Sequence, residues 1–177
     1  MPHAGDTISR LFEYCGGSVD RVSHLGDLGL PVAIVMAALE GRARDASVTI
    51  DDLGELYVAG KQQLTRAESP LARTGDAAFK TRVSELLLDL QRGSAAQPAT
   101  QRLWRTVCDV STREYSRLFR SLGVEVRDLG ESTYVELLRP VVSRLIETGQ
   151  AERSDGAWIV PTDNAKTPII VQKSDGG

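Results

Sequence analysis

The chain has 177 residues, of which 41% are hydrophobic and 25% are charged, and its formal net charge is -3. This size and composition predict a folded chain with one large domain or two small ones. The small net charge gives no argument for nucleic acid or a membrane surface as a partner. No stretch approaches the roughly 20 apolar residues of a membrane span, and no secretory leader pattern opens the sequence, so we expect a cytoplasmic protein without membrane contact.

The cysteines and histidines are few. Cys15 and Cys108 lie in apolar helical patterns, which predicts two reduced, buried thiols and no disulfide. The two histidines, His3 and His24, have no spacing to the cysteines that is typical of zinc ligands. We therefore expect no metal site.

The first elements suggest an α/β arrangement. A helix is predicted over residues 5–15, ended by Gly16-Gly17, and a strand over residues 18–23. A glycine-bounded turn, Gly26-Asp-Leu-Gly29, then leads into a helix from about Pro31 to Arg42. Such turns hold phosphates in many α/β proteins, but this one carries no phosphate-binding lysine. A plain strand-turn-helix junction is the alternative.

Two more helices follow. Asp51 and Asp52 are placed to cap the first of them. In the second, the apolar residues from Phe79 to Leu90 recur at steps of three and four, and Gly93 is expected to stop it.

The longest predicted helix runs from about Ala99 to Leu122 and carries one apolar face that includes Trp104. Its opposite face holds five arginines within an arc of roughly 120°, interrupted only by Asp109. We call this set the arginine ridge: Arg102, Arg105, Arg113, Arg117 and Arg120. Arginines in this arrangement are suited to RNA phosphates, and a solvated helix face is the alternative.

The C-terminal third changes from a helical to a strand pattern. A short strand is predicted over residues 124–127, followed by a helix capped by Ser132 or Thr133, which Pro140 should kink or divide and Gly149 should end. Strands over residues 151–153 and 157–160 are predicted to form a hairpin, to which residues 169–172 could add a third strand.

Three segments in this order resemble one known family. The segment Arg21-Val-Ser-His-Leu-Gly-Asp-Leu-Gly29 is similar to R-V-N-H-x-G-D-W-G of arginyl-tRNA synthetases, which are class I aminoacyl-tRNA synthetases. Leu129-Gly-Glu-Ser-Thr-Tyr134 resembles the family's M-G-E-S-x-Y, and Ile170-Val-Gln-Lys-Ser-Asp-Gly-Gly177 resembles its I-I-Q-K-x-D-G-G. Their order and spacing fit the family along nearly the whole chain.

The resemblance implies a helix-rich α/β fold with three parts. Residues 1–45 would form part of a Rossmann-type nucleotide-binding half, and residues 46–150 a helical insertion. Residues 151–177 would form a β-hairpin and a return strand.

The resemblance also implies a nucleotide pocket whose wall includes residues of the first two segments. No catalytic residue is assigned among them, and we expect no tightly bound cofactor. ATP, with Mg²⁺, would bind only if the family's activity is retained. The implied wall residues are His24, Gly26, Asp27, Gly29, Glu131, Ser132 and Tyr134.

The sequence also departs from the family. The H-I-G-H type signature, whose imidazoles stabilise charge developing on ATP, is expected just before Gly5, where the chain has Met1-Pro-His-Ala. His3 is a lone histidine, and the K-M-S-K-S type loop is missing. In the turn, Leu28, Leu30 and Pro31 stand where the family has tryptophan and polar residues, so we expect packing to have replaced substrate contact.

Three functions follow as hypotheses. The family activity is ATP-dependent ligation of arginine to tRNA, which we do not expect this chain to perform by itself. The alternatives are a non-catalytic paralogue that binds tRNA, a nucleotide or a protein partner, with a homodimer as one form, and a gene fragment without independent function.

Overall fold

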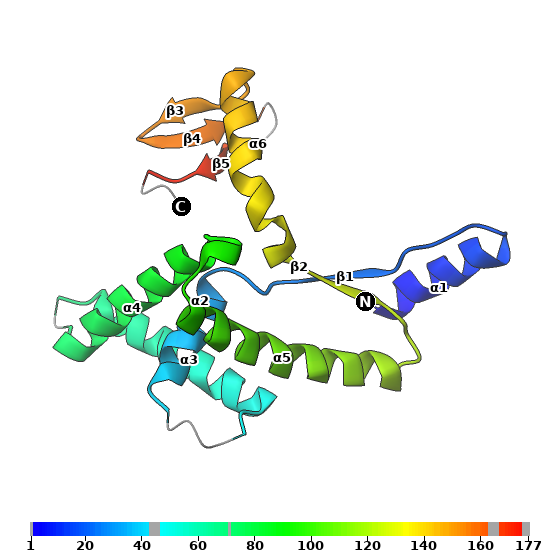
Figure 1. Cartoon of the computed structure of the whole chain (residues 1–177), viewed down its shortest axis with the longest axis horizontal. Coiled ribbons are helices and arrows are strands. Elements are labelled where there is room, and N and C mark those ends of the chain that lie inside the picture. Colours follow the sequence, from blue (N-terminus) through cyan, green and yellow to red (C-terminus); the bar gives the residue numbers. More distant parts are fainter. Residues whose placement is uncertain (1, 43–46, 71, 163–166, 175–177) are drawn as a thin grey trace.

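The computed structural model describes residues 2–42, 47–70, 72–162 and 167–174, and for residues 2 and 3 only the backbone. This part of the chain is a helix-rich α/β structure with one parallel and one antiparallel sheet (Figure 1). The helices are α1 (Pro2–Tyr14), α2 (Leu30–Glu40), α3 (Ile50–Ala67), α4 (Thr74–Leu90), α5 (Pro98–Ser121) and α6 (Val135–Glu147), with short 3₁₀ helices η1 (Gly93–Ala95) and η2 (Glu131–Tyr134). The strands are β1 (Val22–Leu25), β2 (Arg127–Gly130), β3 (Glu152–Ser154), β4 (Ala157–Val160) and β5 (Ile169–Gln172).

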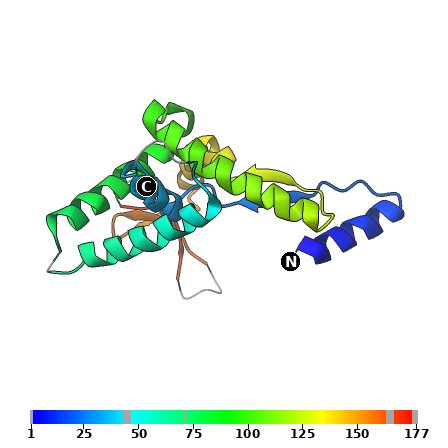
Figure 2. The ribbon, with the colours of Figure 1, turned by 90° about the horizontal axis from the view of Figure 1, so that it is seen from below.

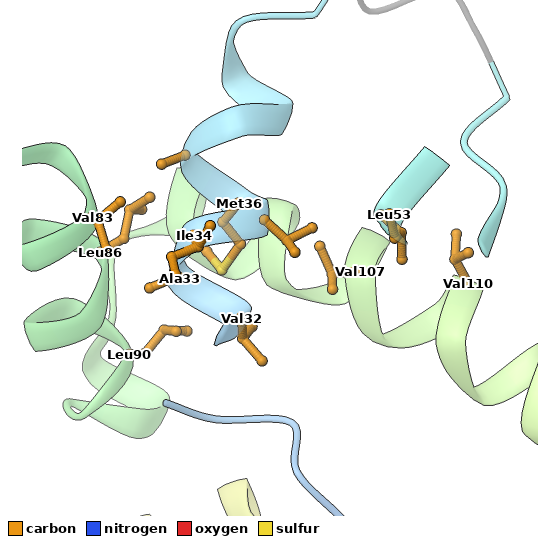
Figure 3. Packing of buried hydrophobic residues seen from close by; sticks show 12 residues of the cluster. Val32, Ala33, Ile34, Met36, Leu53, Val83, Leu86, Leu90, Val107 and Val110 are labelled. Atoms are coloured by element: carbon orange, nitrogen blue, oxygen red, sulfur yellow. The ribbon is translucent and has the colours of Figure 1, made fainter. Parts of the chain in front are cut away.

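The hydrophobic core surrounds α2. All six residues from Val32 to Ala37 are buried, because α3, α4 and α5 each pack against this helix. Figure 3 shows Val83 and Leu86 of α4 pointing toward Ala33 and Ile34 of α2. The run from Val32 to Ala37 is apolar at every position, without helical periodicity, because α2 has packing partners on several sides.

Gly60 of α3 permits the close packing of three helices. A Cβ atom at this buried position would lie 2.5 Å from Ile34 Cγ2 and 3.2 Å from Phe79 Cζ. Only glycine lets α3 come this near to α2 and α4 without displacing a side chain.

Strands β1 and β2 form a two-stranded parallel sheet in which His24 lies opposite Leu129. Both strands begin about three to four residues later than the sequence predicts. The predictions over residues 18–23 and 124–127 were wrong at their boundaries, because the pairing, which starts at Val22 with Arg127, decides where a strand begins. Leu129 and Gly130 accordingly belong to strand β2.

Two predicted helix caps were also wrong. Thr49, and not Asp51 or Asp52, is the N-cap of α3: its side chain accepts the Asp52 N–H, while the Asp52 carboxylate accepts the Thr49 N–H at 2.9 Å. Neither Ser132 nor Thr133 caps α6, which begins after η2 without a side-chain cap.

Helix α6 continues through Pro140 from Val135 to Glu147, so the predicted division did not occur. Pro140 and Glu136 are both exposed, and water can therefore satisfy the Glu136 carbonyl that Pro140 cannot bond.

The antiparallel sheet lies beside α6 and confirms the predicted hairpin and third strand (Figure 1). Strand β4 pairs with both β3 and β5. The tight turn between β3 and β4 places Asp155 and Gly156 at φ 49° and 82°, the left-handed conformations that a two-residue hairpin requires.

Helix α1 stands apart from the α2–α4 bundle in both views (Figures 1 and 2). Its apolar residues Ile8, Leu11 and Phe12 are 55–62% exposed. Polar contacts hold it: Arg10 donates to the Gly123 carbonyl at 3.1 Å, and Arg21 pairs with Glu13 at 2.6 Å. The expected homodimer stays a prediction.

Two further expectations concern the whole chain. The core and the parallel sheet both join segments from either side of residue 45, and the three-part division of the chain stays a prediction. Of the helices that the structure describes, none combines the length and the apolar character needed to cross a membrane.

Candidate functional site

Two segments singled out in the sequence meet at one edge of the parallel sheet. Gly26 and Asp27 follow the end of β1, and Glu131 and Ser132 follow the end of β2. Because parallel strands point the same way, their carboxyl ends lie at the same edge, which is where α/β folds bind ligands. The Asp27 carboxylate accepts the Ser132 N–H at 2.9 Å and the Ser132 hydroxyl at 2.5 Å.

Gly130 makes this approach of the two segments possible. A Cβ atom at Gly130 would overlap the Asp27 carboxylate. The backbone of β2 therefore packs directly against the acid, and the last strand residue before η2 has to be glycine for the Asp27–Ser132 contact to form.

Trp104 of α5 holds the turn from a third side. Its indole N–H donates to the Asp27 backbone carbonyl at 2.8 Å. Asp27 is thus bonded through its side chain to η2 and through its carbonyl to α5. The sequence placed Trp104 on the apolar face of this helix, and its polar contact was not predicted. The only indication was that the N–H of a half-buried indole needs a hydrogen-bond acceptor.

His24 and Tyr134 form an aromatic pair beside this contact. Their ring centroids are 6.2 Å apart and their planes differ by 17°. Both residues are exposed, so the pair presents a partly solvated flat surface at the carboxyl edge of the sheet.

A cavity of about 450 Å³ opens between the β1 turn, β2 and α5. Its polar lining includes His24, Asp27 and Asp128, and its apolar side comes from α5, with Trp104 and Tyr115. The volume is within the range of small-molecule sites. Asp128 and Tyr115 were not predicted as site residues, because no local pattern distinguishes them.

A second cavity of about 340 Å³ lies on the other side of Trp104 and reaches Leu28, Arg105, Ser132 and Glu136. Hydrogen bonds from the Ser94 hydroxyl at 2.8 Å and the Ser94 N–H at 3.2 Å lower the pKa of the Glu136 carboxyl. Glu136 is therefore a stable negative charge at this cavity.

The predicted wall residues are only partly brought together. His24, Gly26 and Asp27 line the larger cavity, Ser132 lines the smaller one, and Tyr134 stacks on His24. Glu131 is exposed and lines neither of these two cavities. Gly29 is the N-cap of α2, and its φ of 98° lets the backbone turn into this helix.

The altered turn packs less than expected. Leu28 does pack against the hydrophobic core. Leu30 is 49% exposed, however, and Pro31 is exposed as well, so packing does not account for these two residues. The expectation that packing had replaced substrate contact was wrong for Leu30 and Pro31, because the buried face of α2 begins only at Val32.

The arginine ridge lies along the face of α5 opposite the apolar stripe, and all five of its side chains are exposed. Arg117 pairs with Glu114 at 3.1 Å, and Arg120 donates to the Ser116 carbonyl of its own helix at 3.2 Å. The ridge is separate from the lining of the larger cavity, and only Arg105 reaches the smaller one.

Metal ligation has no candidate in the described part of the chain, where no three His, Cys, Asp or Glu side chains are close enough to hold an ion. The side chain of His3 lies outside the described residues.

The two thiols differ, contrary to the expectation that both are buried. Cys15 follows the end of α1 and is exposed, whereas Cys108 is partly buried beside the larger cavity. Burial, together with the charges of Asp27 and Asp109, raises the pKa of the Cys108 thiol to about 12. Helical periodicity located both residues but could not show that Cys15, just after the end of α1, is exposed.

We expect iodoacetamide at pH 8 to label Cys15 in the folded chain and to leave Cys108 unmodified. A thiol with this pKa has on the order of a thousandfold less thiolate at that pH than an unperturbed thiol. Peptide mass spectrometry measures the two sites separately, and unfolding in urea should make both reactive. Equal labelling of the two thiols in the folded chain would contradict the burial of Cys108.

Comparison with known proteins gives one consistent family. The family model described as "tRNA synthetases class I (R), catalytic domain" matches residues 3–177. An arginine–tRNA ligase of Prochlorococcus marinus (strain MIT 9303) is 35% identical over 181 residues, covering 98% of this chain and 28% of the relative. The chloroplastic/mitochondrial arginine–tRNA ligase of Arabidopsis thaliana is 32% identical, with 98% and 26% covered. For the human cytoplasmic enzyme the identity is 30%, with 98% and 25% covered.

A solved structure shares the fold. The crystal structure of arginyl-tRNA synthetase from Plasmodium falciparum matches 98% of this chain and 28% of its own, with a TM-score of 0.75 and 24% sequence identity. The chain thus spans about a quarter of the length of the relatives it matches.

Proposed function

This chain belongs to the class I arginyl-tRNA synthetase family, in the region of the catalytic domain, and we propose that it forms one wall of the pocket for ATP and arginine in a tRNA-charging enzyme. The larger cavity at the carboxyl edge of β1 and β2 is the observation that supports this most directly. Ligands of open α/β sheets bind at this edge, and the parallel pair with α2 fits a partial Rossmann-type half.

Asp27 acts as a positioning residue in this proposal. Its carboxylate is occupied by Ser132 and its carbonyl by Trp104, which fixes the turn against η2 and α5. Through these contacts Asp27 fixes the shape of the pocket wall, and little of its carboxylate is left free to bind a substrate.

The His24–Tyr134 pair offers the surface for a flat ligand group. Its ring geometry falls in the range of aromatic stacking, and both side chains reach solvent beside the cavity. A purine base is the group in ATP that matches such a surface, while the imidazole and the phenol edges can hydrogen-bond to it.

We propose further that these 177 residues bind and do not catalyse. Adenylate formation needs groups that stabilise charge developing on the phosphates. The two histidines, His3 and His24, are 21 positions apart in the sequence and do not form the paired H-I-G-H type signature. ATP and Mg²⁺ chemistry would require groups beyond those that line the cavity.

The binding part of the proposal is tested with arginyl-sulfamoyl adenosine, a stable adenylate analogue. Calorimetric titration of the 177-residue chain should give saturable binding, which His24→Ala weakens about tenfold, or about 1.4 kcal/mol, through the lost stacking surface. Tyr14→Ala is the matched control, because Tyr14 is 91% exposed on α1 and remote from the cavity lining. No binding of the analogue, or equal affinity of the His24 variant, would refute the assigned pocket.

The catalytic part is tested by ATP–pyrophosphate exchange with arginine and tRNA present. We expect no exchange above background from this chain. Exchange that depends on arginine would show that catalytic groups are present after all.

A further inference from the structure

The smaller cavity, lined by residues of α5 and α6 among others, is not part of the proposed pocket for ATP and arginine. We propose that it is a second ligand site, which binds a small zwitterion with an apolar body, such as a free amino acid with an aromatic or branched side chain. The site rests on the residues that line this cavity and does not depend on the proposed function.

Four large apolar side chains line the cavity. They come from the β1–α2 turn, α4, α5 and α6, and they are Leu28, Leu90, Trp104 and Val135. Leu90 and Val135 are only 6% and 7% exposed, so the packing of their helices fixes this part of the lining. The volume of about 340 Å³ is near the lower limit of small-molecule sites, about 300 Å³, and therefore favours a ligand with a single ring or a branched chain.

Glu136 supplies a fixed negative charge at the cavity. Its Oε1 accepts the Ser94 hydroxyl at 2.8 Å and the Ser94 N–H at 3.2 Å. Gly93 leaves room for this arrangement, since a Cβ atom there would lie 2.7 Å from Oε1. Both bonds use one oxygen of the carboxylate, and among the described residues no donor bonds the other, so Oε2 stays available for an ammonium group.

Gln101 adds a neutral acceptor to the same lining. Its amide nitrogen donates to the backbone carbonyls of Ser94, at 3.2 Å, and Ala96, at 3.0 Å. Because the nitrogen is used in this way, the amide oxygen is left to accept a hydrogen bond from a ligand. Glu136 and Gln101 together therefore suit a group with several N–H donors, such as an ammonium group.

Arg105 supplies the opposite charge. Its side chain is exposed, and neither an ion pair nor a hydrogen bond joins the guanidinium to another residue in the described part of the chain. Arg105 and Glu136 thus line one cavity without pairing with each other. A ligand that carries an ammonium and a carboxylate group can pair with both, with the carboxylate held by the guanidinium.

The same chemistry disfavours arginine in this cavity. Among the described residues that line it, Glu136 is the one acid. When Glu136 binds the ammonium group, the guanidinium of an arginine ligand would lie among apolar side chains without a carboxylate to accept from it, which is costly. The site therefore differs in specificity from a pocket for arginine.

Trp104 provides the means to observe binding. It lines both cavities, and its indole N–H is held by the Asp27 carbonyl at 2.8 Å. A ligand that packs on this indole changes its surroundings and hence its fluorescence. The other tryptophan, Trp158, lies on β4 and lines neither of these two cavities.

The test is a fluorescence titration of the 177-residue chain carrying Trp158→Phe, in which Trp104 is the single tryptophan. The full probes are L-phenylalanine and L-leucine. Three partial probes are compared with them: phenethylamine lacks the carboxylate, 3-phenylpropionate lacks the ammonium group, and L-arginine lacks the apolar body. Calorimetric titration of the unchanged chain with L-phenylalanine repeats the measurement without a mutation.

Arg105→Gln and Glu136→Gln are the site variants. The matched controls are Arg102→Gln and Glu147→Gln, which remove the same charges from exposed positions of the same two helices and do not line the cavity. Circular dichroism melts establish that all four variants are folded.

We expect L-phenylalanine and L-leucine to bind saturably with a Kd on the order of 1 mM or below, in keeping with their small size. The three partial probes should bind at least about tenfold more weakly, because each leaves a charged group or the apolar lining without its partner. Each site variant should lose about fivefold in affinity for L-phenylalanine, and each control less than about twofold.

Four results would overturn the proposal. They are no saturable binding of L-phenylalanine in either measurement, equal affinity for phenethylamine or 3-phenylpropionate, tighter binding of L-arginine, and equal losses in the site and control variants. The last would place the ligand elsewhere, for example in the larger cavity, which neither Arg105 nor Glu136 lines. For the same reason, failure of the arginyl-sulfamoyl adenosine titration would count against the proposed function and leave this site unaffected.

Discussion

Replacing Leu86 by alanine is expected to lower the free energy of unfolding by about 3 kcal/mol, since large-to-small changes at fully buried leucines cost about 2 to 5 kcal/mol. The Leu86 side chain is 0% exposed and lies where α4 packs against α2. The core of the described chain is small and centred on one helix, so a cavity there affects α2, α3 and α4 together. Urea denaturation followed by circular dichroism measures the loss.

Leu88→Ala is the matched control for this prediction. Leu88 belongs to the same helix and is 48% exposed. The substitution removes the same atoms from a residue that is already about half exposed, so less apolar area is lost from the interior and we expect a loss below about 1 kcal/mol. Similar losses in the two variants would mean that α4 does not pack on α2 through the face containing Leu86.

Replacing Gly130 by alanine is expected to cost about 2 kcal/mol and to open the Asp27–Ser132 contact. The new methyl group would occupy the position of the Asp27 carboxylate, so the acid must move away from the Ser132 N–H and hydroxyl. Losing hydrogen bonds to a charged group and overpacking a tight contact each cost about 1 to 3 kcal/mol. Amide hydrogen exchange at Ser132, measured by NMR, should accelerate by at least about tenfold.

Gly26→Ala is the control within the same turn. A Cβ atom at Gly26 would have nothing within 4 Å, and this glycine has no positive φ. We expect Ser132 exchange and overall stability to stay close to wild type. Unchanged exchange in the Gly130 variant would contradict the close packing of β2 against Asp27, and with it the positioning role of that acid.

The sequence predicted the helices well because helical periodicity is local. The apolar steps from Phe79 to Leu90 and the apolar face that includes Trp104 correspond to α4 and α5, and α5 begins and ends within one residue of its predicted limits. The hairpin at Asp155-Gly156 was also predictable, because a two-residue turn requires left-handed residues that few side chains tolerate.

Strand limits and caps could not be read in the same way. The extent of β1 and β2 depends on their pairing with each other, across about a hundred residues of chain, and the N-cap of α3 depends on the reciprocal Thr49–Asp52 bonds. In the candidate site, motif resemblance identified Asp27 and Ser132 separately. It could not show that they bond to each other, nor that Trp104 completes the contact.

By itself, the sequence determined the helical content, the arginine ridge and the resemblance to arginyl-tRNA synthetases, because these depend on residue types at short, regular spacings. The tertiary structure decided which residues of the two motif segments share a cavity, that Cys15 and α1 remain exposed, and that Leu30 and Pro31 do not pack. The physical reason is that burial and hydrogen bonding depend on contacts between segments that are distant in the sequence. Which segments come into contact is determined by the packing of the whole chain.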